Sequence, residues 1–230
     1  MASAIIVAGG KGIRMNSRVR KQYLSIDGRP ILAHTLMHFA LCSIINNIYL
    51  VVPEEDIDFC YEQILSPFNL KKSGIQIVAG GAERQDSVCN GLMAADSKDG
   101  IVVIHDGVRP FVTPDLITAC IKGAEEFGAC IPGIPAFDTL KQVNEKGYIE
   151  TTLPRDVVWL AQTPQAFQYD LIIRAHKTAK NDRYMGTDDA SLVERIGKKV
   201  KMITGSRRNI KITNKEDIAI AQAIIKEFKP

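Results

Sequence analysis

The sequence predicts an open α/β sandwich, in which helices cover both faces of a mostly parallel sheet. Short runs of β-branched residues alternate along the chain with longer stretches of helical periodicity. The runs are apolar throughout, which is typical of parallel strands that are buried on both faces. The chain has 230 residues, enough for one large α/β domain and short for two complete ones. We therefore expect a single domain over residues 1–230.

Apolar runs are expected to form buried strands, and the periodic stretches between them are expected to form helices. The strands are Ala4–Val7, Tyr49–Val52, Ile75–Val78, Ile101–Ile104 and Cys130–Ile134. The helices are Ile31–Leu41, Ile57–Leu65, Asp86–Ala95 and Pro114–Phe127. Thr113 ahead of Pro114 marks one helix start, and Thr213-Asn214-Lys215-Glu216 predicts a capping box that opens a C-terminal helix up to Lys229.

The alternation of strands and helices stops between Ala136 and Arg155. Thr139–Val143 and Tyr148–Leu153 flank Glu145-Lys146-Gly147, a pattern that predicts a β-hairpin arm at about residues 136–157. A two-stranded ribbon is only marginally stable alone in water, so the arm needs a surface to pack on. The simplest candidate is a second copy of the chain, which makes a homodimer the hypothesis.

Composition excludes several classes of protein. No apolar run approaches the roughly 18 residues of a membrane helix, and no targeting peptide precedes the first strand, so we expect a cytoplasmic protein without a membrane partner. The net charge of +3 is dispersed, which argues against nucleic-acid binding. The five cysteines are widely spaced in apolar segments and predict neither a disulfide framework nor a zinc site. The chain also lacks a Ser-His-Asp set and an HExxH helix, so hydrolytic chemistry has no support.

The first predicted strand leads into a glycine-rich basic loop. Ala8-Gly9-Gly10-Lys11-Gly12-Ile13-Arg14-Met15 follows it directly, and Lys21 comes shortly after. Backbone N–H groups and cations in such a loop favour phosphate binding over a plain βα turn. The loop is not a dinucleotide fingerprint, because it lacks the third glycine and no acidic residue ends the second strand, and it is not a P-loop.

Two more loops follow predicted strands. Gly80-Gly81-Ala82-Glu83-Arg84 and Ser87 follow the third strand, and His105-Asp106-Gly107-Val108-Arg109 follows the fourth. Ligands of open parallel sheets bind beyond the carboxyl ends of the strands, so these loops and the first one should meet at one edge. The glycine pair is the weaker signal, since it could be only a turn.

Residues of the fourth loop have two interpretations each. Asp106 could bind Mg²⁺ or substrate hydroxyls, or it could cap the loop that leads to Pro110; we favour the functional role. Arg109 could bind phosphate or pair with Asp106. His105 has no visible nucleophile or metal partner, so we expect it to be structural.

Further candidates lie in the second half of the chain. Arg155 ends the arm, Thr163-Pro164-Gln165 is expected to form a turn, and Thr187-Asp188-Asp189 is expected to open a helix with Thr187 as its cap. Lys211 lies in the strand-like run Asn209–Thr213, where the residues alone favour a solvent-facing lysine.

Eight segments in register carry a resemblance over nearly the whole chain. They are Ala8–Met15, Lys21–Leu24, Gly80–Val88, His105–Pro110, Asp138–Lys141, Gln162–Gln165, Thr187–Ser191 and Asn209–Thr213. In these segments the chain resembles the 2-C-methyl-D-erythritol 4-phosphate cytidylyltransferases of the non-mevalonate isoprenoid pathway. The resemblance implies a Rossmann-like nucleotidyltransferase of the glycosyltransferase-A-like type. It also implies that a phosphate oxygen of methylerythritol phosphate attacks the α-phosphorus of CTP, with Mg²⁺ as cofactor and pyrophosphate as leaving group.

The resemblance also implies roles for individual residues. Arg14 and Lys21 would stabilise the transition state, and Arg155 and Lys211 would position methylerythritol phosphate, Arg155 from the arm of a second subunit. The remaining roles are the following: triphosphate binding by Ala8, Gly9, Gly10 and Gly12, cytosine recognition by Gly81, Ala82 and Ser87, and substrate or metal-side contacts by Asp106, Arg109, Thr139, Thr163 and Thr187.

Three positions depart from the family pattern. Arg20 stands where the family usually has proline, Gly107-Val108 replaces an alanine-rich turn, and Asn16 stands where glycine is common. None removes a charged contact, but Arg20 is expected to loosen the loop that carries Lys21. The alternatives are a ribitol-5-phosphate cytidylyltransferase, a non-catalytic nucleotide-binding protein, and, least favoured, an NAD-dependent oxidoreductase.

Overall fold

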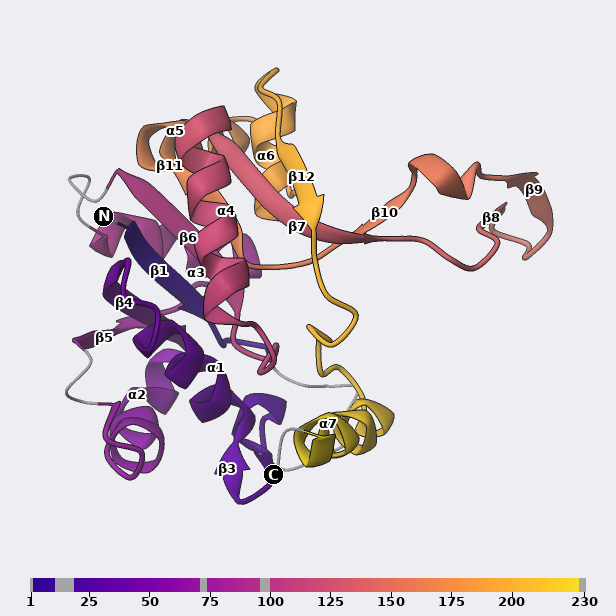
Figure 1. Ribbon diagram of the computed structural model, residues 1–230. Coiled ribbons are helices and arrows are strands. Elements are labelled where there is room, and N and C mark those ends of the chain that lie inside the picture. Colours follow the sequence, from indigo (N-terminus) through magenta and orange to yellow (C-terminus); the bar gives the residue numbers. More distant parts are fainter. Residues whose placement is uncertain (1, 11–18, 71–73, 96–99, 228–230) are drawn as a thin grey trace.

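One mixed, mostly parallel sheet forms the centre of the protein in the computed structural model, which describes residues 2–10, 19–70, 74–95 and 100–227 (Figure 1). The strand order is β10-β7-β11-β6-β1-β4-β5, and β12 pairs with β7. The strands are β1 (Ala2–Val7), β4 (Ile45–Val52), β5 (Ile75–Ala79), β6 (Ile101–Asp106), β7 (Ala129–Pro135), β10 (Trp159–Ala161), β11 (Gln165–Gln168) and β12 (Lys201–Thr204).

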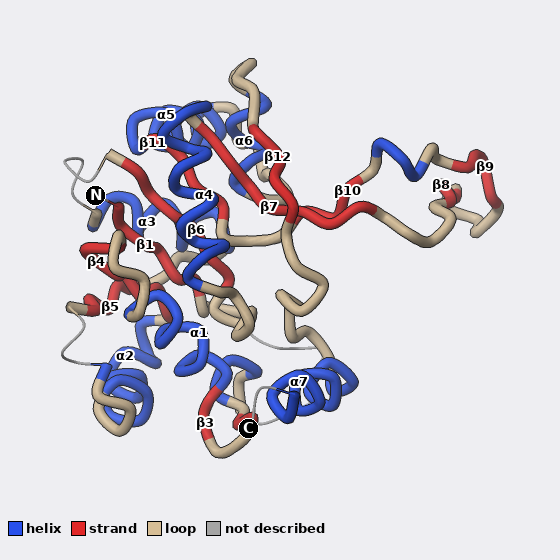
Figure 2. Tube along the Cα trace, viewed as in Figure 1, coloured by secondary structure: helices blue, strands red, loops and turns tan. Residues whose placement is uncertain are grey.

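Helices cover both faces of this sheet, as Figure 2 shows. They are α1 (Ile31–Ala40), α2 (Ile57–Phe59), α3 (Arg84–Ala94), α4 (Pro114–Phe127), α5 (Tyr169–Asn181), α6 (Asp189–Arg195) and α7 (Lys215–Glu227). A π-helical turn, Cys60–Leu65, continues α2, and 3₁₀ turns occur at Lys21–Tyr23, Glu54–Asp56 and Arg155–Val157. None of the helices in the described ranges is long and apolar enough to cross a membrane.

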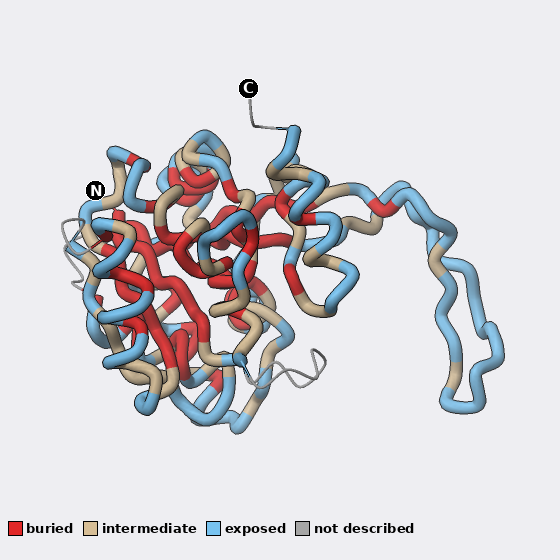
Figure 3. The backbone as a smooth tube through the Cα atoms, turned by 90° about the horizontal axis from the view of Figure 1, so that it is seen from below, coloured by how far each residue is buried: buried red, intermediate tan, exposed pale blue. Residues whose placement is uncertain are grey.

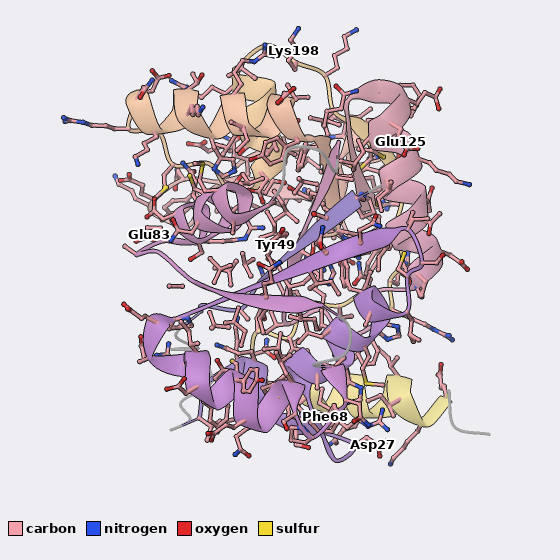
Figure 4. The ribbon with its side chains drawn as sticks, turned by 90° about the vertical axis from the view of Figure 1, so that its left-hand side faces the viewer. Asp27, Tyr49, Phe68, Glu83, Glu125 and Lys198 are labelled. Carbon is pink, nitrogen blue, oxygen red and sulfur yellow. The ribbon has the colours of Figure 1, made fainter. Side chains whose placement is uncertain are left out.

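Successive side chains of the central strands enter two separate cores. Ile6 and Leu50 face the core that α1, α2 and α4 cover, whereas Ile5 and Tyr49 face the core under α3, α5 and α6. Figure 4 shows Tyr49 between the sheet and the helices above it. Because both faces are buried, the strands have no polar face, which explains why their sequences are apolar throughout.

All the predicted strands and helices of the first half are present, with ends that differ by a few residues. The parallel arrangement of β4, β1, β5 and β6 is confirmed by their pairing. The sequence did not predict β10, β11, β12 and α5. The strand β11 lies antiparallel between β6 and β7, and its four residues include two glutamines, too short and too polar to stand out as a strand.

Three local predictions are wrong. The run 209–213 is not a strand: the backbone N–H of Ile212 donates to the carbonyl of Val108, but the run forms no ladder. The last helix is capped by Asn214, whose side chain exchanges hydrogen bonds with Asp217, so the box begins one residue after Thr213. Asp188, not Thr187, caps α6, because its carboxylate reaches the N–H of Ser191 (2.9 Å). The last predicted residues of the final helix, 228–229, lie outside the described residues.

The predicted hairpin arm is confirmed as β8 (Lys141–Val143) paired antiparallel with β9 (Ile149–Thr152). The side chain of Asn144 accepts hydrogen bonds from the N–H groups of Lys146 and Tyr148, and Gly147 has a φ of 82°, which fixes the turn. The arm extends away from the body (Figure 1), and both of its strands are exposed along their length (Figure 3). A smaller pair, β2 (Ser25–Ile26) and β3 (Arg29–Pro30), packs beside α7.

Candidate active site

The loops that follow β1, β5 and β6 meet at the carboxyl edge of the sheet, as the sequence predicts. The N–H of Gly80 donates to the carbonyl of Val52 (2.7 Å), and the N–H of Gly107 donates to that of Val7 (2.9 Å). Each bond ties the start of a loop to the end of the neighbouring strand. The part of the first loop from residue 11 to residue 18, which includes Gly12 and Arg14, lies outside the described residues.

Ser87 joins the first loop to the loop after β5. It lies in the first turns of α3, accepts a hydrogen bond from the N–H of Gly81 (3.0 Å) and donates to the carbonyl of Glu83 (3.1 Å). A Cβ added at Gly9 would lie 3.8 Å from its hydroxyl oxygen. A Cβ at Gly81 would overlap the side chain of Asp86, so this close turn requires glycine. Gly81 and Ala82 are exposed at the rim of the edge.

Lys21 lies beside the first loop, on the 3₁₀ turn Lys21–Tyr23. The amide of the buried Gln22 donates to the carbonyl of Ala8 (2.6 Å), which ties this turn to the end of β1. A Cβ at Gly10 would lie 3.6 Å from Lys21 Cε. Lys21 is therefore near the described part of the predicted phosphate loop.

Asp106 is the centre of the edge and holds three cationic side chains. Its carboxylate pairs with Lys211 Nζ (2.9 Å), Arg84 Nε (3.2 Å) and Arg109 Nε (3.5 Å). Burial by itself would raise the pKa of Asp106, but the charges of Arg84, Lys211 and Arg109 outweigh burial and hold the pKa well below its usual range. The carboxylate is thus ionised, and its bonds hold the three cationic side chains in place around it.

Arg84 belongs to this network, although its sequence pattern predicted no role for it at the site. Besides Asp106 it pairs with the buried Asp189 (2.8 Å), whose other oxygen meets His176 Nε2 (3.2 Å). Burial raises the pKa of Asp189, but Arg84 and His176 lower it by more. The sequence offered one signal for this role, a cation shortly after a strand end. It could not show the pairing, because the carboxylate partners of Arg84 lie 22 and 105 residues away in the sequence.

The expected structural role of His105 is confirmed by its contacts. Its Nε2 contacts the carbonyl of Arg109 (3.2 Å), which can only accept, so Nδ1 accepts from the hydroxyl of Thr163 (2.9 Å). Burial lowers the pKa of His105 to about 3, so the ring is neutral. Thr163 also accepts from the N–H of Asp106 (3.1 Å) and therefore supports Asp106 from inside the protein.

Lys211 is brought to Asp106 by the anchoring of Asn209. The buried Asn209 donates to the carbonyl of Thr163 (2.8 Å), and its own carbonyl accepts from Arg109 Nη1 (2.8 Å). These bonds fix the segment without a strand ladder and turn the Lys211 side chain towards the edge. Lys211 therefore has a partner at the site, while its side chain remains 39% exposed, so the solvent-facing interpretation describes only part of its surroundings.

Three predicted residues are exposed and are not among the described contacts of Asp106. Thr139 and Arg155 lie on the arm and are exposed, and Arg155 Nη1 donates to the carbonyl of Phe137 (3.1 Å) within the arm. Thr187 is exposed one residue before the cap of α6. The arm itself points away from the body of its own chain (Figure 1).

The described residues do not form a protein-held magnesium site. They contain no group of three Asp, Glu, His or Cys side chains that could hold a metal ion, and both oxygens of Asp106 already have cationic partners. Asp106 Oδ1 has Arg84 as its one partner in these contacts, whereas Oδ2 pairs with both Lys211 and Arg109. A single carboxylate together with substrate phosphates is a usual set of ligands for Mg²⁺, so metal binding at Asp106 stays a prediction.

Comparisons with known proteins give one family over the whole length. The family model described as IspD, 2-C-methyl-D-erythritol 4-phosphate cytidylyltransferase, matches residues 2–227. A protein of that name from Syntrophus aciditrophicus is 51% identical over 97% of this chain and 95% of its own length. Another, from Geobacter metallireducens, is 47% identical over 99% of this chain and 98% of its own length. The crystal structure of a 4-diphosphocytidyl-2C-methyl-D-erythritol synthase from Anaerococcus prevotii superposes with a TM-score of 0.86 at 35% identity, covering 98% of this chain and 96% of that one.

Proposed function

The chain belongs to the 2-C-methyl-D-erythritol 4-phosphate cytidylyltransferase family, and from this premise we propose how its residues carry out the reaction. It is a nucleotidyltransferase that transfers the cytidylyl group of CTP to 2-C-methyl-D-erythritol 4-phosphate in isoprenoid precursor biosynthesis. A P–O bond forms between the sugar phosphate and the α-phosphorus, and the bond to the β-phosphate breaks with release of pyrophosphate.

The convergence of cations at the carboxyl edge is the observation that supports the site assignment. Lys21 lies beside the first loop, and Lys211, Arg109 and Arg84 surround Asp106 at the same edge. Phosphoryl transfer needs positioning and charge neutralisation more than covalent help, because the transition state spreads negative charge over phosphate oxygens. Fixed cations supply that neutralisation without reorganising during the reaction.

Each group of residues has a proposed role in this reaction. Ala8, Gly9, Gly10 and Gly12 form the loop that binds the triphosphate. The N–H of Ala8 donates to the carbonyl of Val51 (2.8 Å), so the glycines supply the amides. Arg14 and Lys21 stabilise the transition state. Gly81, Ala82 and Ser87 recognise cytosine, a small base that backbone groups and one hydroxyl can discriminate. Lys211, held by Asp106, positions the attacking phosphate, while Arg109, Thr163 and Thr187 complete the substrate side.

The arm is proposed to complete the site of a second subunit. Large apolar side chains that are exposed in the single chain gather on and around it: Phe137, Val143, Tyr148, Ile149, Leu153, Val157 and Leu160. Exposed apolar groups in such a cluster mark an interaction surface. A homodimer would cover them and bring Thr139 and Arg155 to the partner's edge, where Arg155 would hold the sugar phosphate together with Lys211.

A requirement for Mg²⁺ is also part of the proposal, with Asp106 as the protein carboxylate that would help to hold the ion beside the phosphates of CTP. Mg²⁺ usually keeps several waters and binds through substrate phosphates, so it does not need a carboxylate cage. Loss of turnover on chelation and its return on adding Mg²⁺ would support this requirement. A cytoplasmic location belongs to the same proposal and is checked by cell fractionation.

The substrate assignment is tested by incubating the enzyme with CTP, Mg²⁺ and one polyol phosphate at a time while following pyrophosphate. We expect release with methylerythritol phosphate and little with ribitol 5-phosphate. The ribitol enzyme is not favoured, because the family match is to the methylerythritol enzymes. Turnover of ribitol 5-phosphate alone would contradict the assignment.

A further inference from the structure

The turn that carries Lys21 is attached to a single carboxylate from both sides. Arg20, directly before Lys21, pairs through Nε with Asp56 Oδ2 (3.0 Å). Tyr23, two residues after Lys21, donates its hydroxyl to the same oxygen (2.8 Å). Asp56 lies 33 residues beyond Tyr23 in the sequence, in the 3₁₀ turn before α2. The turn that carries Lys21 is thereby fixed to a different part of the fold.

Asp56 is a firm point of attachment because its surroundings are packed. Its side chain is 15% exposed, and the Tyr23 hydroxyl also contacts the thiol of the fully buried Cys60 (3.2 Å). Burial raises the pKa of Cys60 to about 11, so this thiol stays protonated at neutral pH. The ring of Tyr23 packs against Phe59, with ring centroids 4.8 Å apart.

Arg20 also bonds to a second carboxylate, that of Glu55, through Nη2 (2.5 Å). A guanidinium that uses two of its nitrogens on two carboxylates is restrained in orientation as well as in position. Gln22 adds a third attachment through its bond to the carbonyl of Ala8. The backbone of Lys21 is therefore held between fixed neighbours.

The backbone of Arg20 explains why this attachment matters. Its φ of −61° is a value that a proline ring would impose covalently, and its ψ of 141° is one that proline readily adopts, whereas arginine is free to leave both. The ion pairs with Asp56 and Glu55 restrict it instead. We propose that Arg20 is a positioning residue that, through Asp56, holds Lys21 at the phosphate being transferred. This inference rests on the proposed catalytic role of Lys21.

Replacing the arginine tests the inference. Arg20→Ala should lower kcat about tenfold and change KM for CTP less than about twofold, because a displaced cation loses transition-state stabilisation first. Arg20→Pro should recover most of the lost kcat, since the ring restores φ. Asp56→Asn, which removes the charge from the other end, should lower kcat in the same direction. Circular dichroism and melting curves show whether each variant is folded.

A matched control separates positioning from the general loss of an ion pair. Arg195 pairs with Asp182 at 2.9 Å and lies over the ring of Tyr184. Like Arg20, it is thus an arginine beside an aspartate and a tyrosine, and Arg195→Ala removes these contacts from another part of the protein. We expect Arg195→Ala to keep kcat. The most specific readout is Arg20→Ala combined with Lys21→Ala, assayed at high enzyme concentration. No loss beyond that of Lys21→Ala is expected, because Arg20 acts through Lys21.

The outcomes distinguish this inference from the proposed function. If Lys21→Ala is severely impaired and Arg20→Ala stays within about twofold of wild type, the positioning role is overturned and the role of Lys21 stands. An additive loss in the double variant, or failure of Arg20→Pro to recover kcat, would overturn it as well. If Lys21→Ala itself stays near wild type, the premise fails and the inference fails with it.

Discussion

The carboxyl edge of the sheet and the hairpin arm differ in where their side chains find partners. At the edge, charged and polar groups are bonded within one chain around the buried Asp106, which pairs with three cations, and Thr163 supports Asp106 and His105. On the arm, Tyr148 and Val157 are 70% and 76% exposed. The network around Asp106 thus finds its partners in its own chain, whereas the arm presents apolar surface that the single chain leaves uncovered (Figure 3).

The difference teaches that the two regions contribute in different ways. A network of buried charges holds its groups in one arrangement, which suits transition-state stabilisation. An exposed ribbon gains stability and a defined position only by packing against another surface. Changes at the edge should therefore affect chemistry in every subunit, and changes on the arm should affect assembly first.

The largest effect is expected at the edge. Lys21→Ala should lower turnover by roughly two orders of magnitude or more while keeping the fold, because it removes charge stabilisation of the transition state. Lys122→Ala, an exposed lysine on α4, is the matched control. Steady-state kinetics of both variants and their melting curves provide the measurement. Turnover within a few-fold of wild type would show that Lys21 does not act on the reacting phosphate.

The arm is tested by making its surface polar. Tyr148→Ser together with Val157→Ser should raise the dissociation constant of the dimer at least about tenfold, because each buried large apolar side chain contributes about 1.5–3 kcal/mol. Leu41→Ser is the control, since Leu41 is 71% exposed on the body, just after α1. Sedimentation velocity across a concentration series measures the equilibrium. A monomeric wild type at micromolar concentration would remove the basis of the arm's proposed role.

A smaller effect concerns stability at low pH. The folded-state pKa of His105 is about 3, below its ordinary value of about 6.5 in an unfolded chain. A lowered pKa gives stability that is fully present above pH 6.5 and is lost as the pH falls towards 3. Between pH 7 and pH 4.5 this group alone should remove on the order of 2 kcal/mol from the free energy of unfolding.

Urea unfolding at the two pH values measures this slope. His105→Gln should flatten it, because glutamine has no proton to bind in this pH range. An unchanged slope in His105→Gln would contradict the buried neutral state of the ring.

The sequence predicted the regions that are apolar or glycine-rich and missed those that depend on distant partners. Apolar runs such as Ile101–Ile104, which the structure extends to Asp106, predicted the strands, and the strand ends then located the three loops of the edge. Arg84, Asp189 and His176 could not be found in the same way, because a single charged residue has the same local pattern whether it is solvated or paired across the fold. Lys211 is a further example: only the anchoring of Asn209 turns it towards Asp106.

The resemblance to the family compensated for part of this limit. It assigned Lys211 to the site where the local pattern favoured a solvent lysine, and the structure pairs Lys211 with Asp106. Its assignment of Thr187 to the site stays a prediction. It did not supply the contacts of Arg20, because that residue departs from the family pattern and its partners, Glu55 and Asp56, lie more than thirty residues along the chain.

Mixing two inactive variants tests most directly whether the arm of one subunit completes the edge of the other. Lys21→Ala and Arg155→Ala subunits are combined in equal amounts and allowed to exchange, with exchange verified by mass spectrometry of tagged chains. Half of the dimers are then mixed, and each mixed dimer has one site with both Lys21 and Arg155 intact. The account predicts recovery to about a quarter of wild-type activity. Verified exchange without recovery would contradict it.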